Sequence, residues 1–235
     1  MQRYFVKKKQ EAFLELELSD VHHIKNVMRY QKGEKIECIY QQQGYLCEII
    51  DPSSNQVKII STLENTSLEK CPLTIAVGLV KEQKFDLMIQ KLTELGVKEI
   101  IPIKMERSIV KLGEEKITKK LERWQKIAKE AAEQSKRTTI PTIYSPLSIN
   151  ELSRLSYDKK FVCSTKKCEK LNVNYLQNLK EYATMIFVIG PVGGITEKEE
   201  EVLLSSGYAP ISFGEQIMRV ETATIYVASV VQFMK

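Results

Sequence analysis

Short hydrophobic runs alternate with turn-forming residues over the first part of the chain. These runs are Tyr4–Val6, Phe13–Leu18, Lys35–Tyr40, Tyr45–Ile50 and Gln56–Leu63. Runs of this length, bounded by polar clusters, predict strands. The pattern is typical of a small β-rich domain, and a barrel with one inserted helix fits it.

A single helical pattern interrupts these strands. It begins near Ser19–Asp20 and stops at Gly33. We expect this helix to carry His22, His23, Lys25 and Arg29. The segment Glu64–Pro72 then lacks periodicity and ends in proline, so we place a domain boundary there and assign residues 1–70 to the first domain.

The pattern then changes to apolar strands that alternate with amphipathic helices. It predicts an α/β domain with a parallel sheet over residues 71–235. Strands are expected at Leu73–Leu79, Glu99–Ile103, Lys160–Ser164, Met185–Ile189 and Ala209–Phe213. Apolar positions recur at helical spacing from Phe85 to Leu95, and Gly96 stands where a left-handed residue ends a helix. Further helices are expected near 172–182 and 196–206.

A long helix is predicted after the second of these strands, with an apolar stripe along one face. The stripe consists of Ile117, Leu121, Trp124, Ile127 and Ala131. The surrounding segment, residues 104–139, holds 11 basic and 6 acidic residues, which accounts for the net charge of +5 of the whole chain. Such a surface attracts a polyanion, although a solvated helix face explains the charge equally well.

The last segment, Ala223–Met234, is apolar nearly all round and rich in β-branched residues. Propensity alone allows a strand, but we interpret the segment as a helix over residues 221–234. A terminal helix that is apolar on every side needs a deep groove or a partner subunit. We expect a homodimer.

Composition narrows the class of protein. Of the 235 residues, 43% are hydrophobic and 28% are charged, and no apolar stretch approaches the length of a membrane span. The N-terminus lacks the apolar core of a signal peptide, so we expect a soluble, cytoplasmic protein. Five cysteines without a C-x-x-C spacing and two adjacent histidines favour neither a disulfide framework nor a metal site.

Half of the ten glycines fall within 25 residues near the C-terminal end, at Gly190, Gly193, Gly194, Gly207 and Gly214. The first three follow a predicted strand, and glycine at the carboxyl end of a parallel strand lets the backbone approach a ligand closely. The spacing matches neither G-x-G-x-x-G nor G-x-x-x-x-G-K-[ST], so a dinucleotide site or a P-loop is not indicated. Taken alone, the loop can also be a simple turn.

The segment Ser212–Ala223 repeats this arrangement of strand end, glycine loop and helix start, which suggests that the two loops share one pocket. Arg219 and Glu221 flank the start of the last helix. They can form a helix cap and a salt bridge, or they can be functional groups of the pocket. Serine, cysteine and histidine form no nucleophilic arrangement, because both histidines belong to the other domain.

Taken in order, these motifs resemble the RsmE-type ribosomal RNA uridine-N3 methyltransferases of the SPOUT superfamily. The resemblance spans nearly the whole chain, in the segments Arg3–Val6, His23–Arg29 with Gly33, Phe85–Gly96, Glu106–Lys111, Arg123–Trp124, Glu130–Ser135, Ile189–Gly194 and Phe213–Ala223. It implies a PUA-like β-barrel, followed by an α/β-knot domain whose C-terminal part forms a trefoil knot, and a homodimer. Such a knot breaks the usual rule against threaded chains.

The resemblance also implies S-adenosylmethionine (AdoMet) as the cofactor. Its binding residues are then Ser164, Thr165, Ile189, Gly190, Gly193, Gly194, Ser212, Phe213, Gly214, Ile217, Met218, Val220, Thr222 and Ala223. Arg219 is expected to act at the base, where its guanidinium stabilises negative charge on a uracil carbonyl oxygen as N3 loses its proton. Glu221 is expected to hold Arg219 or to accept a proton through water.

The implied substrate is 16S ribosomal RNA, within the small subunit. Residues expected to contact it are His23, Arg29, Arg107, Lys111, Arg123, Lys136 and Arg137. Three positions depart from the family pattern, since Val192 replaces an acid, Gln216 an arginine and Lys136 a glycine. They leave two alternatives open: a ribosome-binding assembly factor of the same fold that has lost turnover, and a methyltransferase that acts on another RNA.

Overall fold

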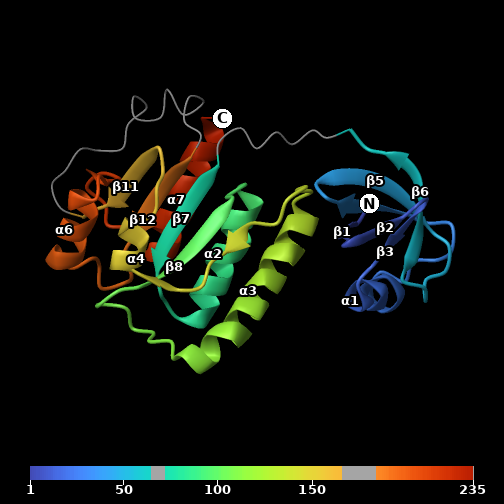
Figure 1. Ribbon diagram of the computed structural model, residues 1–235, viewed down its shortest axis with the longest axis horizontal. Coiled ribbons are helices and arrows are strands. Elements are labelled where there is room, and N and C mark those ends of the chain that lie inside the picture. Colours follow the sequence, from blue (N-terminus) through green and yellow to red (C-terminus); the bar gives the residue numbers. More distant parts are fainter. Residues whose placement is uncertain (65–71, 166–183, 235) are drawn as a thin grey trace. The chain divides into compact units, whose positions relative to one another are not determined.

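The protein consists of two compact units, seen in a computed structural model that describes residues 1–64, 72–165 and 184–234 (Figure 1). The described residues of the first unit are 1–64 and 132–140. Those of the second unit are 72–131, 141–165 and 184–234. The boundary expected at residue 70 and the helix expected at 172–182 lie outside the described residues.

Among the described residues of the first unit, six strands form a mixed sheet in the order β1-β4-β5-β6-β3-β2. They are β1 (Arg3–Phe5), β2 (Lys8–Gln10), β3 (Phe13–Glu15), β4 (Lys35–Tyr40), β5 (Gln43–Ile49) and β6 (Gln56–Thr62). β1 pairs with β4 in parallel, and the other neighbours are antiparallel. Alternate residues such as Ile36 and Cys38 face one core, as the period of a half-buried strand requires. Each expected strand has a counterpart, and β2 is additional.

The inserted helix is shorter than the sequence predicts. α1 (Leu18–His22) continues as a π-helical turn, η1 (His23–Val27), and the helical backbone ends at Met28. Arg29 follows with φ +56°, in the left-handed region that commonly ends a helix. The prediction that Arg29 lies on the helix and that Gly33 ends it is therefore wrong, because a residue other than glycine adopts the terminating conformation.

In the described part of the second unit, seven strands form an all-parallel sheet with the path β10-β8-β7-β12-β11-β13 and β9 beside β8. They are β7 (Leu73–Gly78), β8 (Glu99–Lys104), β9 (Thr142–Ile143), β10 (Leu147–Ser148), β11 (Lys159–Cys163), β12 (Met185–Ile189) and β13 (Ala209–Ile211). The predicted α/β fold with a parallel sheet is confirmed, and β9 and β10 are additional. Because β12 lies between β7 and β11, the carboxyl ends of strands far apart in the sequence meet at one edge.

Helices cover both faces of this sheet. They are α2 (Glu82–Glu94), α3 (Glu114–Gln134), α4 (Ile149–Ser153), α6 (Glu197–Ser205) and α7 (Val220–Phe233). α2 and α7 pack against one face, and α4 and α6 against the other (Figure 1). Every residue of β7 is buried, as expected for a parallel strand with two covered faces.

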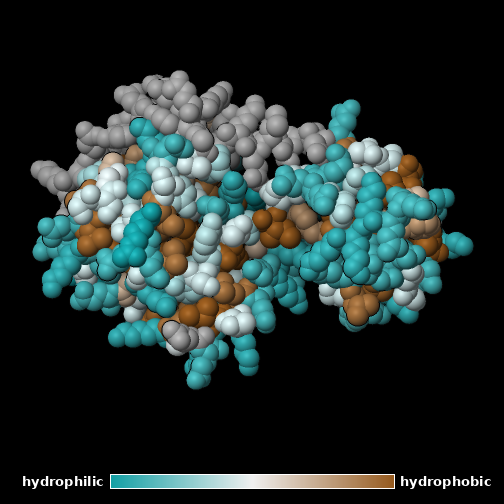
Figure 2. Space-filling view, in the orientation of Figure 1, coloured by the Kyte–Doolittle hydropathy of each residue, from teal (hydrophilic) through white to brown (hydrophobic). Residues whose placement is uncertain are grey.

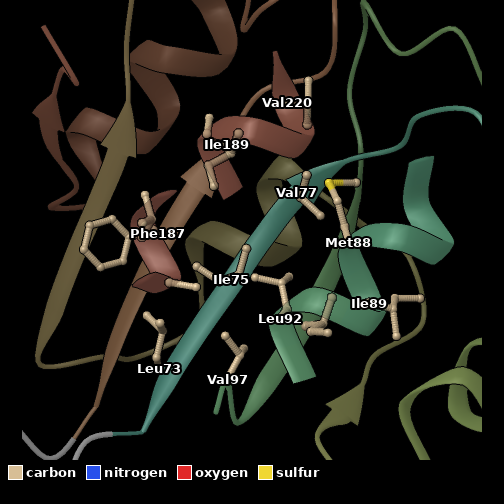
Figure 3. Packing of buried hydrophobic residues seen from close by; sticks show 14 of the residues in the cluster. Leu73, Ile75, Val77, Met88, Ile89, Leu92, Val97, Phe187, Ile189 and Val220 are labelled. Atoms are coloured by element: carbon tan, nitrogen blue, oxygen red, sulfur yellow. The ribbon is translucent and has the colours of Figure 1, made fainter. Parts of the chain in front are cut away.

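Residues along β7 alternate between two cores. Ile75 and Val77 lie on the side of Met88 and Leu92 of α2 (Figure 3), whereas Ala76 belongs to the opposite core. The predicted end of α2 is confirmed, because Gly96 follows it with φ +79°. This packing fixes the strand ends that surround the site.

The last segment is a helix, as predicted, but one side of it is buried and another is exposed. Val220, Ala223, Val227 and Val231 are buried at helical spacing, whereas Tyr226 and Phe233 are exposed. The trefoil knot and the homodimer stay predictions. None of the described helices has the length and the apolar character needed to cross a membrane. Hydrophilic residues predominate on the face shown in Figure 2, with smaller hydrophobic areas between them.

Candidate active site

A cavity of about 360 Å³ opens at the carboxyl edge of the parallel sheet. Its walls come from the ends of β11 and β12, from the segments that follow β12 and β13, and from the first turn of α7. This edge is where open α/β sheets bind ligands. The two glycine loops that the sequence singles out therefore share one pocket, as predicted.

The first loop, residues 190–194, packs so closely at Gly190 and Gly193 that a side chain at either position is excluded. A Cβ added to Gly190 would lie 2.7 Å from Cγ1 of Ile195, and one added to Gly193 would lie 2.9 Å from Cβ of Arg107. The guanidinium of Arg107 also donates a hydrogen bond of 3.2 Å to the carbonyl oxygen of Gly193. These contacts hold the loop backbone in place at the cavity wall.

The second loop leads directly into α7. Arg219 is the N-cap residue of this helix, and its carbonyl oxygen accepts the amide of Ala223 at 2.8 Å. The rings of Phe213 and Tyr226 pack with centroids 5.4 Å apart, which ties the start of the loop to the helix. Because Arg219, Val220 and Ala223 line the cavity, the N-terminal end of α7 lies at its wall, and the free amide groups of a helix N-terminus favour polar or negatively charged ligand atoms.

Most residues expected to bind the cofactor line this cavity. They are Ser164, Thr165, Ile189, Gly190, Gly194, Phe213, Gly214, Ile217, Met218, Val220 and Ala223, and Arg219 lines it with them. Gly193, Ser212, Glu221 and Thr222 are not among the lining residues. Gly193 contacts Arg107 instead, and Thr222 is exposed on α7.

Glu221 forms an ion pair that the sequence analysis did not predict. Its Oε1 lies 2.9 Å from Nζ of Lys84, which is on α2. Burial raises the pKa of the Glu221 carboxyl, but the hydrogen bond and charge of Lys84, with the charge of Arg219, outweigh this effect and hold the pKa below its ordinary value. Oε2 of Glu221 is buried and has no hydrogen-bond partner among the described residues. Glu221 is therefore an ionised carboxylate with an unused acceptor.

Sequence reasoning missed several lining residues. The most informative are Lys84, Cys163 and Glu200, which come from α2, β11 and α6. Glu200 is buried and follows a capping box in which the Thr196 hydroxyl accepts the amide of Glu199. The sequence could have indicated Lys84 as a site residue, because it lies just beyond the carboxyl end of β7, at the same edge as the glycine loops.

The residues expected to contact RNA fall into two groups. Arg29 and Lys111 are exposed, and Arg29 lines an open polar groove of the first unit together with Lys25 and Tyr30. His23 is half-buried, and its Nδ1 lies 3.0 Å from the hydroxyl of Tyr4.

Like His23, the other four residues make contacts within the protein. Arg107 holds the glycine loop, and Arg123 pairs with Glu82 and Asp86 at 2.6 Å each. Lys136 pairs with Glu37 at 3.0 Å, and Arg137, only 9% exposed, donates to the hydroxyl of Thr139 at 3.1 Å. The cationic groups of these residues are thus partly committed to intramolecular partners.

Glu37 shows what Lys136 contributes to the first unit. The carboxylate accepts from Nε of Arg3 at 2.9 Å as well as from Lys136. Burial raises the pKa of the Glu37 carboxyl, but these two hydrogen bonds and charges lower it below its ordinary value. Lys136 and Arg3 together therefore tie residues 132–140 to the sheet of this unit.

The comparisons with known proteins agree with this geometry. A family model described as RNA methyltransferase domain matches residues 67–232, and one described as RNA methyltransferase PUA domain matches residues 17–60. The class is thus that of the RNA methyltransferases with a PUA domain. The ribosomal RNA small subunit methyltransferase E of Bacillus subtilis is 36% identical over 99% of this chain and 96% of its own length.

Two solved structures resemble the whole chain and contain the cofactor. A ribosomal RNA small subunit methyltransferase E from Neisseria gonorrhoeae, bound to AdoMet, is 25% identical with a TM-score of 0.89, and 100% of this chain and 98% of that one are covered. A Legionella pneumophila structure with bound AdoMet is 26% identical with a TM-score of 0.91, and 99% and 97% are covered. The chain belongs to the RsmE family of AdoMet-dependent RNA methyltransferases.

Proposed function

We propose that this protein transfers the methyl group of AdoMet to N3 of a uridine in 16S ribosomal RNA. The observation that carries the proposal is the cavity of about 360 Å³ where the two glycine loops and the start of α7 meet, with Arg219 in its wall. Its place in the fold is the one where α/β proteins bind ligands. The alternatives of a non-catalytic assembly factor and of another RNA target become outcomes of the test below.

The chemistry of the cavity fits AdoMet. Ile189, Met218 and Ala223 supply apolar surface for a heterocyclic base, while the hydroxyls of Ser164 and Thr165 and the loop backbone supply polar groups for the remainder. A mainly apolar wall with a few convergent polar groups is the usual composition of a cofactor site. AdoMet supplies an electrophilic methyl group when bound. The role of the chain is then to present uridine N3 to that methyl group.

Arg219 acts at the base. It is exposed and forms no ion pair among the described residues, so its guanidinium can donate to a uracil carbonyl oxygen. An arginine stays protonated in proteins, so its part is to stabilise the negative charge that develops as N3 loses its proton, not to remove that proton. Glu221 is ionised and has a free acceptor at Oε2, and because it does not line the cavity it accepts the proton through water.

The surroundings of the reaction are proposed as follows. The exposed side chains of Arg29, Lys25 and Lys111 contact RNA phosphates. The exposed aromatic side chains Tyr226 and Phe233, the latter 88% exposed, lie on α7 and support a homodimer through this helix. The enzyme acts in the cytoplasm, where ribosomal RNA is found.

The test is methyl transfer from labelled AdoMet to small ribosomal subunits that lack this modification, compared with naked ribosomal RNA. The expected product is 3-methyluridine in 16S RNA, identified by mass spectrometry. The variant Arg219→Ala should lose roughly 100- to 1,000-fold in rate, as for the loss of one group that stabilises developing negative charge. Because Arg219 is exposed, the variant should fold normally, and unchanged melting would verify this.

Other results point to the alternatives. A folded wild-type protein that binds no AdoMet in calorimetry and transfers no label is the assembly factor. A methyl group found outside 16S RNA would show that the enzyme has another substrate, and one found on another atom of the base would show that N3 is not the target. Full activity of the Arg219 variant removes Arg219 from the mechanism.

A further inference from the structure

A second cavity, of about 220 Å³, adjoins the cofactor cavity and has no role so far. We call it the side cavity, and its lining residues are Leu79, Val80, Lys81, Lys84, Ile109 and Val192. Two of these, Lys84 and Val192, also line the cofactor cavity. The two spaces therefore share a wall.

The side cavity is apolar except for lysine. Leu79 and Val80 are buried, and Ile109 and Val192 are 65% and 61% exposed. Large apolar side chains that remain exposed around a cavity beside an active site are a common sign of a binding surface. Walls of this kind favour a planar, uncharged ring over a phosphate or a sugar, because the ring gains dispersion contacts and loses little hydration.

Lys84 sets the polar preference of the side cavity. An ammonium group has three hydrogen-bond donors and no acceptor, so it favours a carbonyl oxygen over an amino group. Its Nζ lies 2.9 Å from Oε1 of Glu221, whose side chain is only 16% exposed. One donor is thereby used and the position of the group is fixed, while the remaining donors are available to a ligand.

We propose that the side cavity receives the target base and that Lys84 donates a hydrogen bond to one of its carbonyl oxygens. In uracil a carbonyl group stands on each side of N3, so Lys84 and Arg219 can each hold one carbonyl and leave N3 between them. Cytosine carries an amino group at one of these positions, and a lysine there disfavours it. Bases in single-stranded RNA can be splayed out to reach such a pocket. This subsite depends on the function proposed above and adds its base selectivity.

The test compares variants at two residues of the side cavity. Lys84→Met removes the donor, Lys84→Arg keeps a cation, and Ile109→Ser alters the apolar wall at a residue that does not line the cofactor cavity. Lys91→Met is the matched control, because Lys91 is on the same helix and forms a similar ion pair with Glu94 at 2.9 Å.

The expected results separate binding of RNA from binding of cofactor. With small subunits that lack the modification, Lys84→Met should lower the single-turnover rate roughly 10- to 100-fold, the value of one hydrogen bond to a charged group. Lys84→Arg should restore part of this loss, and Ile109→Ser should raise the KM for RNA. Affinity for AdoMet, measured by calorimetry, should stay unchanged in Ile109→Ser, and Lys91→Met should match the wild type. Wild-type rates and KM values in both Lys84→Met and Ile109→Ser would overturn the subsite and leave the methyltransferase function intact.

A second measurement tests the subsite without turnover. Ribosomal RNA that contains 4-thiouridine is irradiated with the wild-type protein, and the cross-linked peptides are mapped by mass spectrometry. Cross-links to the peptides with Ile109 or Val192 support the subsite even if no methyl transfer is detected. Cross-links confined to other parts of the chain would overturn it.

Discussion

Two carboxylates at opposite edges of the parallel sheet, Glu99 and Glu221, differ in their hydrogen bonding. At the amino edge, the carboxylate of Glu99 accepts hydrogen bonds from the hydroxyls of Thr74, Tyr144 and Tyr157, at 2.7, 3.0 and 3.2 Å. At the carboxyl edge, close-packed glycine loops surround a cavity, and Oε2 of Glu221 is buried without a hydrogen-bond partner among the described residues.

The amino edge therefore contributes to stability, whereas the carboxyl edge binds ligands. The half-buried carboxylate of Glu99 accepts three hydrogen bonds within the protein, and these contacts stabilise the fold. An unused buried acceptor costs free energy in the isolated protein, and a ligand or water can recover that cost. Substitutions at the amino edge should therefore lower stability without changing the reaction, and substitutions at the carboxyl edge should change the reaction.

The largest effect on methyl transfer is expected for Gly78→Ala, at the carboxyl edge. The added Cβ would lie 2.6 Å from both Cδ and N of Pro191, and a proline ring cannot move aside without shifting the glycine loop. We expect methyl transfer to be abolished, binding of AdoMet to be strongly weakened in calorimetry, and the free energy of unfolding to fall by about 1–3 kcal/mol. Gly113→Ala is the control, because a Cβ there meets nothing within 4 Å, and an equal loss in that variant would contradict the explanation.

The next effect is expected for Glu99→Ala, at the amino edge. The change leaves three hydroxyls without their shared acceptor, so urea denaturation should show a loss of about 2–3 kcal/mol in the free energy of unfolding. The rate of methyl transfer per folded molecule should not change. Glu130→Ala, at an exposed position of α3, should alter neither quantity. A lower rate of methyl transfer per folded molecule of Glu99→Ala would contradict the conclusion that the amino edge contributes only to stability.

Alkaline pH should also act at the amino edge. Burial raises the pKa of Tyr208, which directly precedes β13, to about 12 from an ordinary value of 10.0. Above pH 10.0 the unfolded chain loses this proton before the folded protein does. The contribution of Tyr208 to the free energy of unfolding is therefore fully present below pH 10.0. It falls as pH rises, by up to about 1.4 kcal/mol per pH unit. Denaturant unfolding over this range should show the decline, and Tyr208→Phe should reduce its slope. An unchanged slope in that variant would assign the decline to other groups.

The smallest effect is expected away from both edges, for Arg123→Ala on α3. Its guanidinium pairs with Glu82 and Asp86, but the side chain is 54% exposed, and exposed pairs contribute little to stability. The melting temperature and the affinity for RNA, measured in a filter-binding assay, should both stay close to the wild-type values. Lys111→Ala, which removes an exposed cation, should weaken RNA binding measurably. A larger loss of RNA affinity in Arg123→Ala than in Lys111→Ala would show that Arg123 breaks its ion pairs to bind RNA.

The sequence predicts much of the second unit because its signals are local. Gly96 marks the end of α2, and the apolar runs of β7, β8, β11 and β12 mark strands, since burial on both faces leaves a continuous hydrophobic run. The clustering of glycines also indicates the site. In the first unit the same kind of signal fails at Arg29, because a left-handed backbone in a residue other than glycine has no clear sequence pattern.

The class of fold, the family and the two loops of the site can all be predicted from the amino-acid sequence. The tertiary structure alone decided which side chains meet there. Lys84 reaches Glu221 across 137 positions, and Arg107 reaches Gly193 across 86, because β12 inserts between β7 and β11 and brings their carboxyl ends together. Periodicity records whether a residue faces a core or solvent, but partners at this separation depend on strand order, and strand order is set by packing of the whole sheet.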